Sequence, residues 1–324
     1  MRIILIGSLL HLAFCGLVRD DSPDEMDIND ELSEEAFEAL FGETPITDPV
    51  ELEKHRQALA EEEEEVKSVN KEYLEGKKTW YEKIDEFSDL PFDEFEARRT
   101  GLIDGYSRGL IDSDEMDPES ERYFDSYRLG RFSVPNNYSS VDLGYVTGVK
   151  DQGDYCASCV AFASIATIEV CFKKLTGVDG DYSEQQLVDC GFGINGANGC
   201  NKALAHSYLK TISETHLGLT HESNYPYINA NGASCPSGLE TYNRGAVVSK
   251  SYWTHQGTED MLEYEVAMRG AAVSSIATDG MDWRAYNGGT YDGDCSTHVD
   301  HAITVVGYGT DDTGMKYWLI KNSW

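Results

Sequence analysis

The chain has 324 residues, of which 40% are hydrophobic, enough to pack one large domain or two of ordinary size. Its formal net charge is −32, with 26 basic against 58 acidic side chains. This excess of negative charge argues against nucleic acid and anionic membrane surfaces as partners.

The first 18 residues are typical of a secretory signal. Arg2 provides the positive start, residues 3–14 (IILIGSLLHLAF) form an apolar core, and small residues follow near a plausible cleavage point. The apolar core is too short to span a bilayer, and no later stretch reaches that length. We therefore expect an exported, soluble chain that is secreted or delivered to lysosomes or endosomes.

Residues 19–132 are acidic and contain no cysteine. Residues 50–74 have apolar side chains at roughly helical spacing beside a run of five glutamates, and residues 84–99 form a second, shorter helical pattern. Both predicted helices need another surface to pack on. The acidity has two readings, a solvated face or tail, or a detachable segment.

The remaining residues, 133–324, have the composition of a globular domain. Residues 159–177 predict a buried helix that ends at Lys173, Lys174 and Gly177. Residues 302–309 and 316–324 predict two strands joined by the turn-like residues 310–314. Helices first and strands last favour an α+β fold with two subdomains facing one another.

Seven cysteines of the predicted mature chain all lie in this second part, while the eighth, Cys15, lies in the signal. They are Cys156, Cys159, Cys171, Cys190, Cys200, Cys235 and Cys295. In an exported protein this odd number predicts disulfides with one thiol left over. Cys156 and Cys159 have three readings: a redox pair, a metal clip, or a structural cysteine beside a reactive one. A thioredoxin-like motif lacks the preceding strand, and a zinc site lacks a second close-spaced pair.

Three residues suggest nucleophilic chemistry. Cys159 falls at the start of the predicted buried helix, where the helix dipole lowers the pKa of a thiol. His301 precedes one predicted strand and Asn322 lies in the other, so an antiparallel pairing centred in the turn brings them roughly opposite. The Asn322 amide oxygen then holds one imidazole nitrogen while the other faces Cys159, the Cys-His-Asn logic of acyl transfer. A bulge would spoil this estimate.

Five segments in order make the chain resemble a papain-like cysteine protease of the cathepsin L type. They are VKDQGDYCASCVAF, YSEQQLVDC, NGCNKA, VDHAITVVGYG and IKNSW, and the resemblance covers residues 134–324. It implies a two-subdomain fold, with a helical left domain and a barrel-like right domain. Cys159 is then the nucleophile, His301 the general acid and base, Asn322 the orienting residue, and Gln152 a donor to the oxyanion hole.

The resemblance also assigns binding residues and disulfides. Trp324 would cover the histidine–asparagine bond, and the substrate cleft would involve Lys202, Ala203, Leu204, Ile276, Asp300, Ala302 and Trp324. The implied disulfides are Cys156–Cys200 and Cys190–Cys235, whereas Cys171 and Cys295 receive no partner in this chain. No metal or other cofactor is implied. Separately, Asn137 in NYS is a glycosylation acceptor if its loop is exposed.

Residues 19–132 are similar to the inhibitory prosegment of that family, which makes the chain's own prosegment its intramolecular inhibitor. The family's Glu-Arg-Phe-Asn-Ile-Asn spacing falls on Glu51, His55, Leu59, Glu62, Val66 and Asn70, and a second pattern falls on Lys83, Asp85, Phe87 and Asp89. Only some of these positions match. The implied release at acidic pH fits a segment rich in carboxylates, whose pairings weaken on protonation.

Four departures from the family pattern matter for function. Val160 replaces the usual tryptophan, one residue is inserted before Cys156, Lys202 and Ala203 replace a glycine pair, and the sequence stops at Trp324. The last leads us to expect an incomplete sequence. We therefore predict a cysteine-type endopeptidase made as a zymogen, acting on proteins or peptides. The alternatives are a catalytically silent homologue that binds peptides or partners, and an acidic storage or matrix protein.

Overall fold

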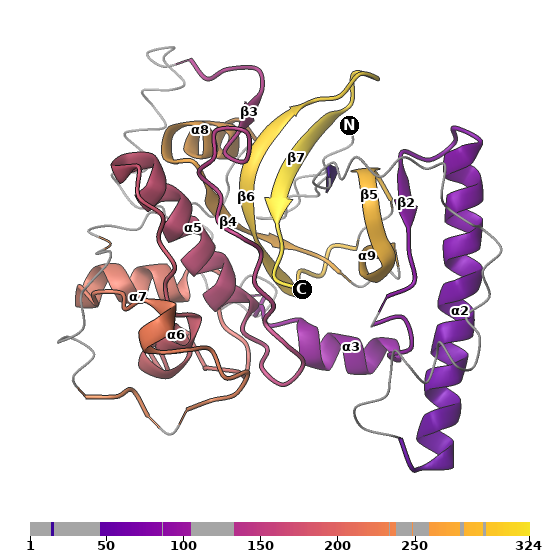
Figure 1. The fold of residues 1–324 in the computed structure, drawn as a ribbon, viewed down its shortest axis with the longest axis horizontal. Helices are drawn as coiled ribbons and strands as arrows, with labels where there is room; N and C mark the ends of the chain where they lie inside the picture. Colours follow the sequence, from indigo (N-terminus) through magenta and orange to yellow (C-terminus); the bar gives the residue numbers. More distant parts are fainter. Residues whose placement is uncertain are drawn as a thin grey trace. The chain divides into compact units, whose positions relative to one another are not determined.

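The computed structural model describes residues 14–15, 46–85, 87–104, 133–232, 234–237, 248, 259–278, 282–293 and 296–324. The chain forms two compact units, each built from stretches far apart in sequence (Figure 1). Among the described residues, the first unit comprises 98–278 and 296–324, and the second comprises 14–97 and 282–293. The expected boundary between residues 132 and 133 follows a stretch outside the described residues and stays a prediction.

The central helix of the first unit is α5 (Cys159–Thr176). Its residues from Cys159 to Val170 are all buried, as an almost continuous apolar run predicts. Gly177 ends the helix in the left-handed conformation (φ 73°), and its N–H donates to the carbonyl oxygen of Lys173. The helix therefore begins and ends where the sequence predicts.

The sheet of the first unit is organised around β6 (His301–Thr310), which α5 covers. Strand β7 (Lys316–Lys321) pairs antiparallel along one edge of β6, while β4 (Ala272–Ile276) and β3 (Tyr138–Ser139) pair along the other. Nine of the ten residues of β6 are buried. Figure 1 shows β6 and β7 as one long hairpin beside α5. The described strands form an open sheet in the expected barrel-like region and do not close into a barrel.

Shorter elements complete the first unit. They are α6 (Glu184–Cys190), α7 (Ser207–Thr215), the 3₁₀ turn η2 (Glu222–Asn224) and α8 (Glu259–Arg269), which packs on β4 and β6. The Ser183 hydroxyl caps α6 by accepting a hydrogen bond from the N–H of Gln186. Disulfides join Cys156 to Cys200 and Cys190 to Cys235, the two pairs that the resemblance implies.

The second unit combines the long helix α2 (Pro49–Leu74) with a small sheet. Strand β5 (Tyr286–Tyr291) lies between β2 (Trp80–Glu82) and β1 (Phe14–Cys15), and α9 (Asp282–Ala285) precedes β5. Helix α3 (Phe92–Arg99) ends in the first unit. Residues 84–91 were expected to be helical, but α3 begins only after Pro91, because proline fits the start of a helix and not its interior.

The buried face of α2 contains most of the positions that the family spacing selects. Buried there are His55, Leu59, Glu62, Val66, Val69 and Asn70. Glu62 forms an ion pair of 2.7 Å with Arg284, and His55 lies 2.8 Å from the carboxylate of Asp89. The Asn70 side chain donates to the carbonyl oxygen of Glu82 and accepts from its N–H. The mismatched residues His55 and Glu62 thus face inward with polar partners, whereas Val50 is exposed.

None of the helices in the described residues contains a stretch both long and apolar enough to cross a membrane. Those same residues hold no cluster of three or more histidine, cysteine or acidic side chains arranged for a metal ion.

Candidate active site

Cys159 is held at the start of α5 by a tightly bonded turn. The N–H of Ser158 donates to the carbonyl oxygen of Cys156 at 2.7 Å, and the N–H of Ala157 donates to that of Cys200 at 3.2 Å. The Cys156–Cys200 disulfide fastens the same turn to the loop that contains Lys202 and Ala203. Cys159 itself is fully buried and is one of the two free cysteines among the described residues; the other is Cys171.

His301 and Asn322 meet at the end of the β6–β7 hairpin. The Nε2 atom of His301 lies 2.8 Å from Oδ1 of Asn322, so Nε2 donates to the amide oxygen. The Nδ1 atom is buried and has no hydrogen-bond partner among the described residues. The ring of Trp324 lies 4.4 Å from the His301 ring, centroid to centroid. The pair therefore presents Nδ1 as its unused nitrogen.

The register of this hairpin differs from the simple estimate. Thr304 pairs with Lys321 and Gly307 with Leu319, so the register shifts at a bulge between Val305 and Gly307. His301 and Asn322 are therefore not directly opposite in the ladder. Asn322 follows Lys321, the last residue of β7, so its backbone makes no ladder hydrogen bond to β6. Its side chain nevertheless reaches the His301 ring.

Gln152 is fixed by the residue after Asn322. The N–H of Gln152 donates to the carbonyl oxygen of Ser323, and the Ser323 hydroxyl donates to Oε1 of Gln152 at 2.8 Å. These bonds orient the side chain of Gln152, so that its Nε2 donates to the carbonyl oxygen of Arg99. Two residues earlier, Lys150 forms ion pairs with Glu169 of α5 and Glu184 of α6. These ion pairs hold the loop that leads to Gln152.

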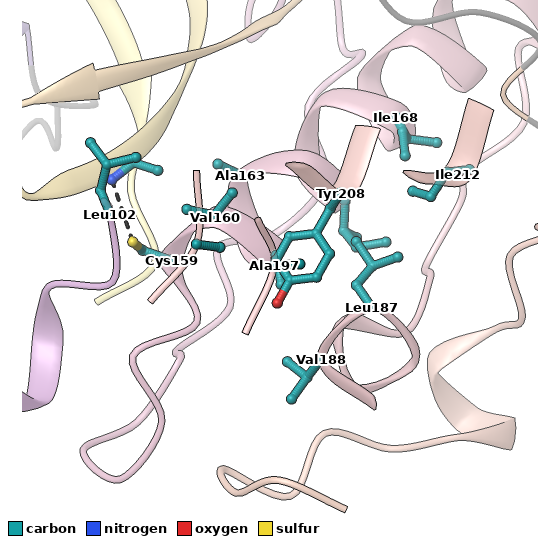
Figure 2. Close-up of a cluster of buried hydrophobic side chains, with 14 of the residues drawn as sticks. Leu102, Cys159, Val160, Ala163, Ile168, Leu187, Val188, Ala197, Tyr208 and Ile212 are labelled. Carbon is teal, nitrogen blue, oxygen red and sulfur yellow. Dashed lines mark hydrogen bonds between the residues drawn. The ribbon is translucent and has the colours of Figure 1, made fainter. Parts of the chain in front are cut away.

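Residues 99–104, which we call the covering segment, lie directly over Cys159. The N–H of Ala203 donates to the carbonyl oxygen of Gly101 and the N–H of Ile103 donates to that of Ala203, both at 2.8 Å, while the N–H of Leu102 donates to that of Asp300 at 2.9 Å. Figure 2 shows Leu102 beside the Cys159 sulfur at the start of α5. A Cβ on Gly101 would lie 2.1 Å from the carbonyl oxygen of Ala157 and 3.0 Å from the sulfur.

Burial under this segment controls the charge of the two reactive groups. Burial raises the pKa of the Cys159 thiol to about 12, against partial relief from backbone N–H groups. Burial also lowers the pKa of His301 to about 4, although its hydrogen bond to Asn322 acts the other way. The sequence-based expectation of a lowered thiol pKa is therefore wrong for the covered state, because desolvation outweighs the helix dipole.

Most of the other expected cleft residues contact Cys159, His301 or the covering segment. Ala203 and Asp300 bond the covering segment through their backbones, and Ala302 donates its N–H to the Cys159 sulfur at 3.4 Å. The Asp300 carboxylate is buried and accepts bonds from the N–H and hydroxyl of Thr278. Ile276 pairs with His301 in the β4–β6 ladder, and Leu204 is buried against Gly196. Lys202 is half-buried with φ 79°, a strained conformation for a lysine.

Three further expectations have different outcomes. Val160, in the position where the family has tryptophan, is fully buried in the hydrophobic cluster around α5 and Leu102. Asn137 is exposed just before β3, as a glycosylation acceptor requires. Cys295 and nearly all of the predicted signal lie outside the described residues.

The sequence reasoning missed the residues that connect the covering segment to the site. Arg99 accepts a hydrogen bond of 2.9 Å from the Nε2 of Gln152 on its carbonyl oxygen, and its guanidinium pairs with Asp151 and Asp154. The only available signal was the inserted residue before Cys156, which lengthens the turn that includes Asp154.

Comparisons with known proteins point to one family for this chain. Residues 134–324 match the family model described as papain family cysteine protease. The chain is 35% identical over 271 residues to a senescence-specific cysteine protease of Oryza sativa subsp. indica, covering 80% of this chain and 73% of that protein. It is 36% identical over 253 residues to a cathepsin L-like proteinase of Fasciola hepatica, covering 74% of this chain and 68% of that protein.

A solved structure shows the same similarity in three dimensions. The digestive procathepsin L2 proteinase from the larval midgut of Tenebrio molitor superposes with a TM-score of 0.72 at 28% sequence identity. The superposition covers 90% of this chain and 88% of that one.

Proposed function

Because the chain belongs to the papain family of cysteine proteases, we propose that it hydrolyses peptide bonds with Cys159, His301 and Asn322 and is made as a zymogen. The observation that carries this proposal is the His301–Asn322 bond of 2.8 Å, next in sequence to Ala302, whose N–H donates to the covered Cys159 sulfur. The covered geometry accounts for an inactive form, and the residues beneath it account for an active one.

The reaction uses the groups in a fixed order. With the covering segment removed, the Cys159 thiol passes its proton to Nδ1 of His301, and the thiolate attacks the carbonyl carbon of the scissile bond. The resulting oxyanion accepts hydrogen bonds from the N–H of Cys159 and from Nε2 of Gln152. The imidazolium then protonates the leaving amine, and the carbon–nitrogen bond breaks to give a thioester on Cys159.

The second half of the reaction regenerates the enzyme. His301 takes a proton from water, and the hydroxide oxygen attacks the thioester carbonyl. Collapse of this intermediate breaks the carbon–sulfur bond and releases a carboxylic acid. Throughout, Asn322 keeps the imidazole in one tautomer, and the Trp324 ring packs against His301. Endopeptidase rather than exopeptidase action is part of the proposal.

The proposal also assigns the inhibitory segment and the destination of the protein. Residues 19–132 serve as the prosegment, and the backbone bonds of Gly101 to Ile103 support this role by occupying the place of a peptide over Cys159. The signal-like residues 1–18 and the two disulfides support a secreted or lysosomal destination. The burial of Val160 supports a packing role for that departure.

The test is alkylation of the full chain by a peptidyl epoxide directed at active-site thiols. After incubation at pH 4.5 to remove the prosegment, we expect one adduct, mapped by mass spectrometry to Cys159, and none in the His301→Ala variant. Before incubation, the reaction should be slow because Cys159 is covered. An incubated chain that has lost residues 19–132 and still gives no adduct would leave a silent, peptide-binding homologue as the better description.

A further inference from the structure

The guanidinium of Arg99 occupies a site made by two carboxylates. Its Nη1 atom lies 2.8 Å from Oδ1 of Asp151, and its Nη2 atom lies 2.5 Å from Oδ1 of Asp154. Only 3% of the Arg99 side chain is exposed, while the side chains of Asp151 and Asp154 remain 57% and 40% exposed. The site thus holds a basic group of the chain itself, nearly removed from water, between two acidic groups that face solvent.

This pair of carboxylates lies on one particular side of Cys159. Asp151 and Asp154 flank Gln152, whose Nε2 donates to the Arg99 carbonyl oxygen. Gly101 lies over the sulfur, and Leu102 and Ile103 follow on the side of Asp300 and Ala203. By the family resemblance, the loop at Lys202 and Ala203 binds the acyl part of a substrate. Arg99 therefore lies on the opposite side of Cys159, where the leaving-group part of a substrate would bind.

The Asp151 half of the site is held independently of Arg99. Oδ1 of Asp151 accepts a hydrogen bond of 2.9 Å from the N–H of Gly153, which fixes this carboxylate whether or not Arg99 is present. Asp154 belongs to the turn that one inserted residue lengthens before Cys156. When the prosegment leaves, two neighbouring carboxylates lose their guanidinium and repel one another, and a basic side chain of another peptide relieves that repulsion.

We propose that Asp151 and Asp154 form a subsite that selects peptides with arginine, and less strongly lysine, as the second residue after the scissile bond. The inference rests on the proposed function and specifies its substrate class. Arginine is preferred because a planar guanidinium reaches both carboxylates at once, as Arg99 does, whereas an ammonium group is a single point charge. The prosegment then inhibits partly by placing its own arginine in this subsite.

The first experiment compares three internally quenched peptides that differ only at the second residue after the scissile bond. That residue is arginine, its neutral isostere citrulline, or glutamate, and the enzyme is the full chain after incubation at pH 4.5. We expect kcat/KM for the arginine peptide to exceed that for the citrulline peptide by about fivefold, and the glutamate peptide to be the poorest. A wild-type ratio near one with efficient hydrolysis overturns the inference and leaves the proposed function intact.

Matched variants locate the effect. In Asp151→Asn and Asp154→Asn, the arginine-to-citrulline ratio should fall toward one. Asp312→Asn, which removes an exposed carboxylate in the β6–β7 turn, should keep the wild-type ratio. An unchanged ratio in both subsite variants would contradict the assignment.

A second measurement does not depend on hydrolysis. In the full-length Arg99→Gln variant, iodoacetamide should alkylate Cys159 faster than in the wild type, and the arginine peptide should slow this reaction at about fivefold lower concentration than the citrulline peptide. If no peptide is hydrolysed but this selectivity is present, the proposed function fails and the subsite stands. If both peptides protect equally, the subsite fails. Should Arg99→Gln not fold, Arg99→Met in the full chain, which also removes the guanidinium and keeps both carboxylates, permits the same comparison.

Discussion

The side-chain amide of Gln152 donates a hydrogen bond of 2.9 Å to the backbone carbonyl oxygen of Arg99. The donor proposed for the oxyanion is thus already bonded to a carbonyl of the covering segment. In the proposed reaction, the same amide binds an oxygen that gains charge, so it contributes more in the transition state than in the covered state.

Replacing this donor should reduce turnover and not substrate binding. We expect Gln152→Ala to lower kcat about a hundredfold with little change in KM, because the lost bond strengthens only as charge develops on the oxygen. Ser323→Ala, which leaves the amide in place but removes the hydroxyl that orients it, should have a smaller effect. Steady-state kinetics on fluorogenic peptides provide both values, and a defect confined to KM would argue against an oxyanion role.

Asn322→Ala should disturb the pH profile as well as the rate. The hydrogen bond to Asn322 raises the pKa of His301, so its removal lowers that pKa. The alkaline limb of kcat/KM, which reports loss of the imidazolium, should therefore move to lower pH, and kcat should fall about a hundredfold. An unshifted limb would mean that Asn322 has only a structural role.

The covered chain should lose stability as the pH falls. Burial lowers the pKa of His301 to about 4, below its ordinary value of 6.5, so the unfolded or uncovered chain binds a proton first. The loss begins as the pH falls below 6.5, grows by about 1.4 kcal/mol per pH unit, and levels off below pH 4.

Urea unfolding at several pH values checks this linkage. Carboxylates also titrate in this range, so the contribution of His301 is the difference in slope between the wild type and His301→Asn. Equal slopes in the two chains would contradict the linkage. A steeper wild-type slope would support the expected release of the covering segment at acidic pH.

Glu62 and Arg284 should be strongly coupled in the stability of the second unit. Their ion pair is almost fully buried, and Arg284 also donates to the carbonyl oxygen of Leu90. Removing one partner in Glu62→Leu leaves an unpaired buried charge, which costs about 3–5 kcal/mol, whereas the double variant Glu62→Leu with Arg284→Met should lose far less. Thermal unfolding of the four chains gives the coupling energy.

The exposed pair of Glu51 and Lys54 on the same helix supplies the control for that cycle. Glu51→Gln should hardly change the unfolding temperature, because an exposed ion pair contributes little. Additive losses in the Glu62 and Arg284 variants would show that the two side chains act independently.

Local signals made part of this structure predictable. The helix over residues 159–176 and the β6–β7 hairpin follow from unbroken apolar runs, a left-handed glycine and a turn-like spacer. The meeting of His301 with Asn322 followed from the spacing of that hairpin, although the bulge at Val305–Gly307 shifts the register. No local pattern in the sequence predicts this bulge.

Long-range pairings were beyond reach. The partner of Glu62 lies 222 residues away, and the acidic spacing on α2 contains no sign of Arg284. The thiol pKa was misjudged for the same reason: the helix start is local, whereas the burial of Cys159 under residues 99–104 is a property of the folded chain. The inserted residue before Cys156 was visible in the sequence, but the ion pair between Arg99 and Asp154 in the lengthened turn was not.

The close approach at Gly101 sets a size limit on the zymogen. A single added methyl group would meet the carbonyl oxygen of Ala157 at 2.1 Å, in a turn that the Cys156–Cys200 disulfide keeps from moving aside. A larger residue than glycine has no room at this position. The covered, inactive form therefore requires glycine at position 101, because its α-carbon has only a hydrogen atom where every other amino acid has a Cβ.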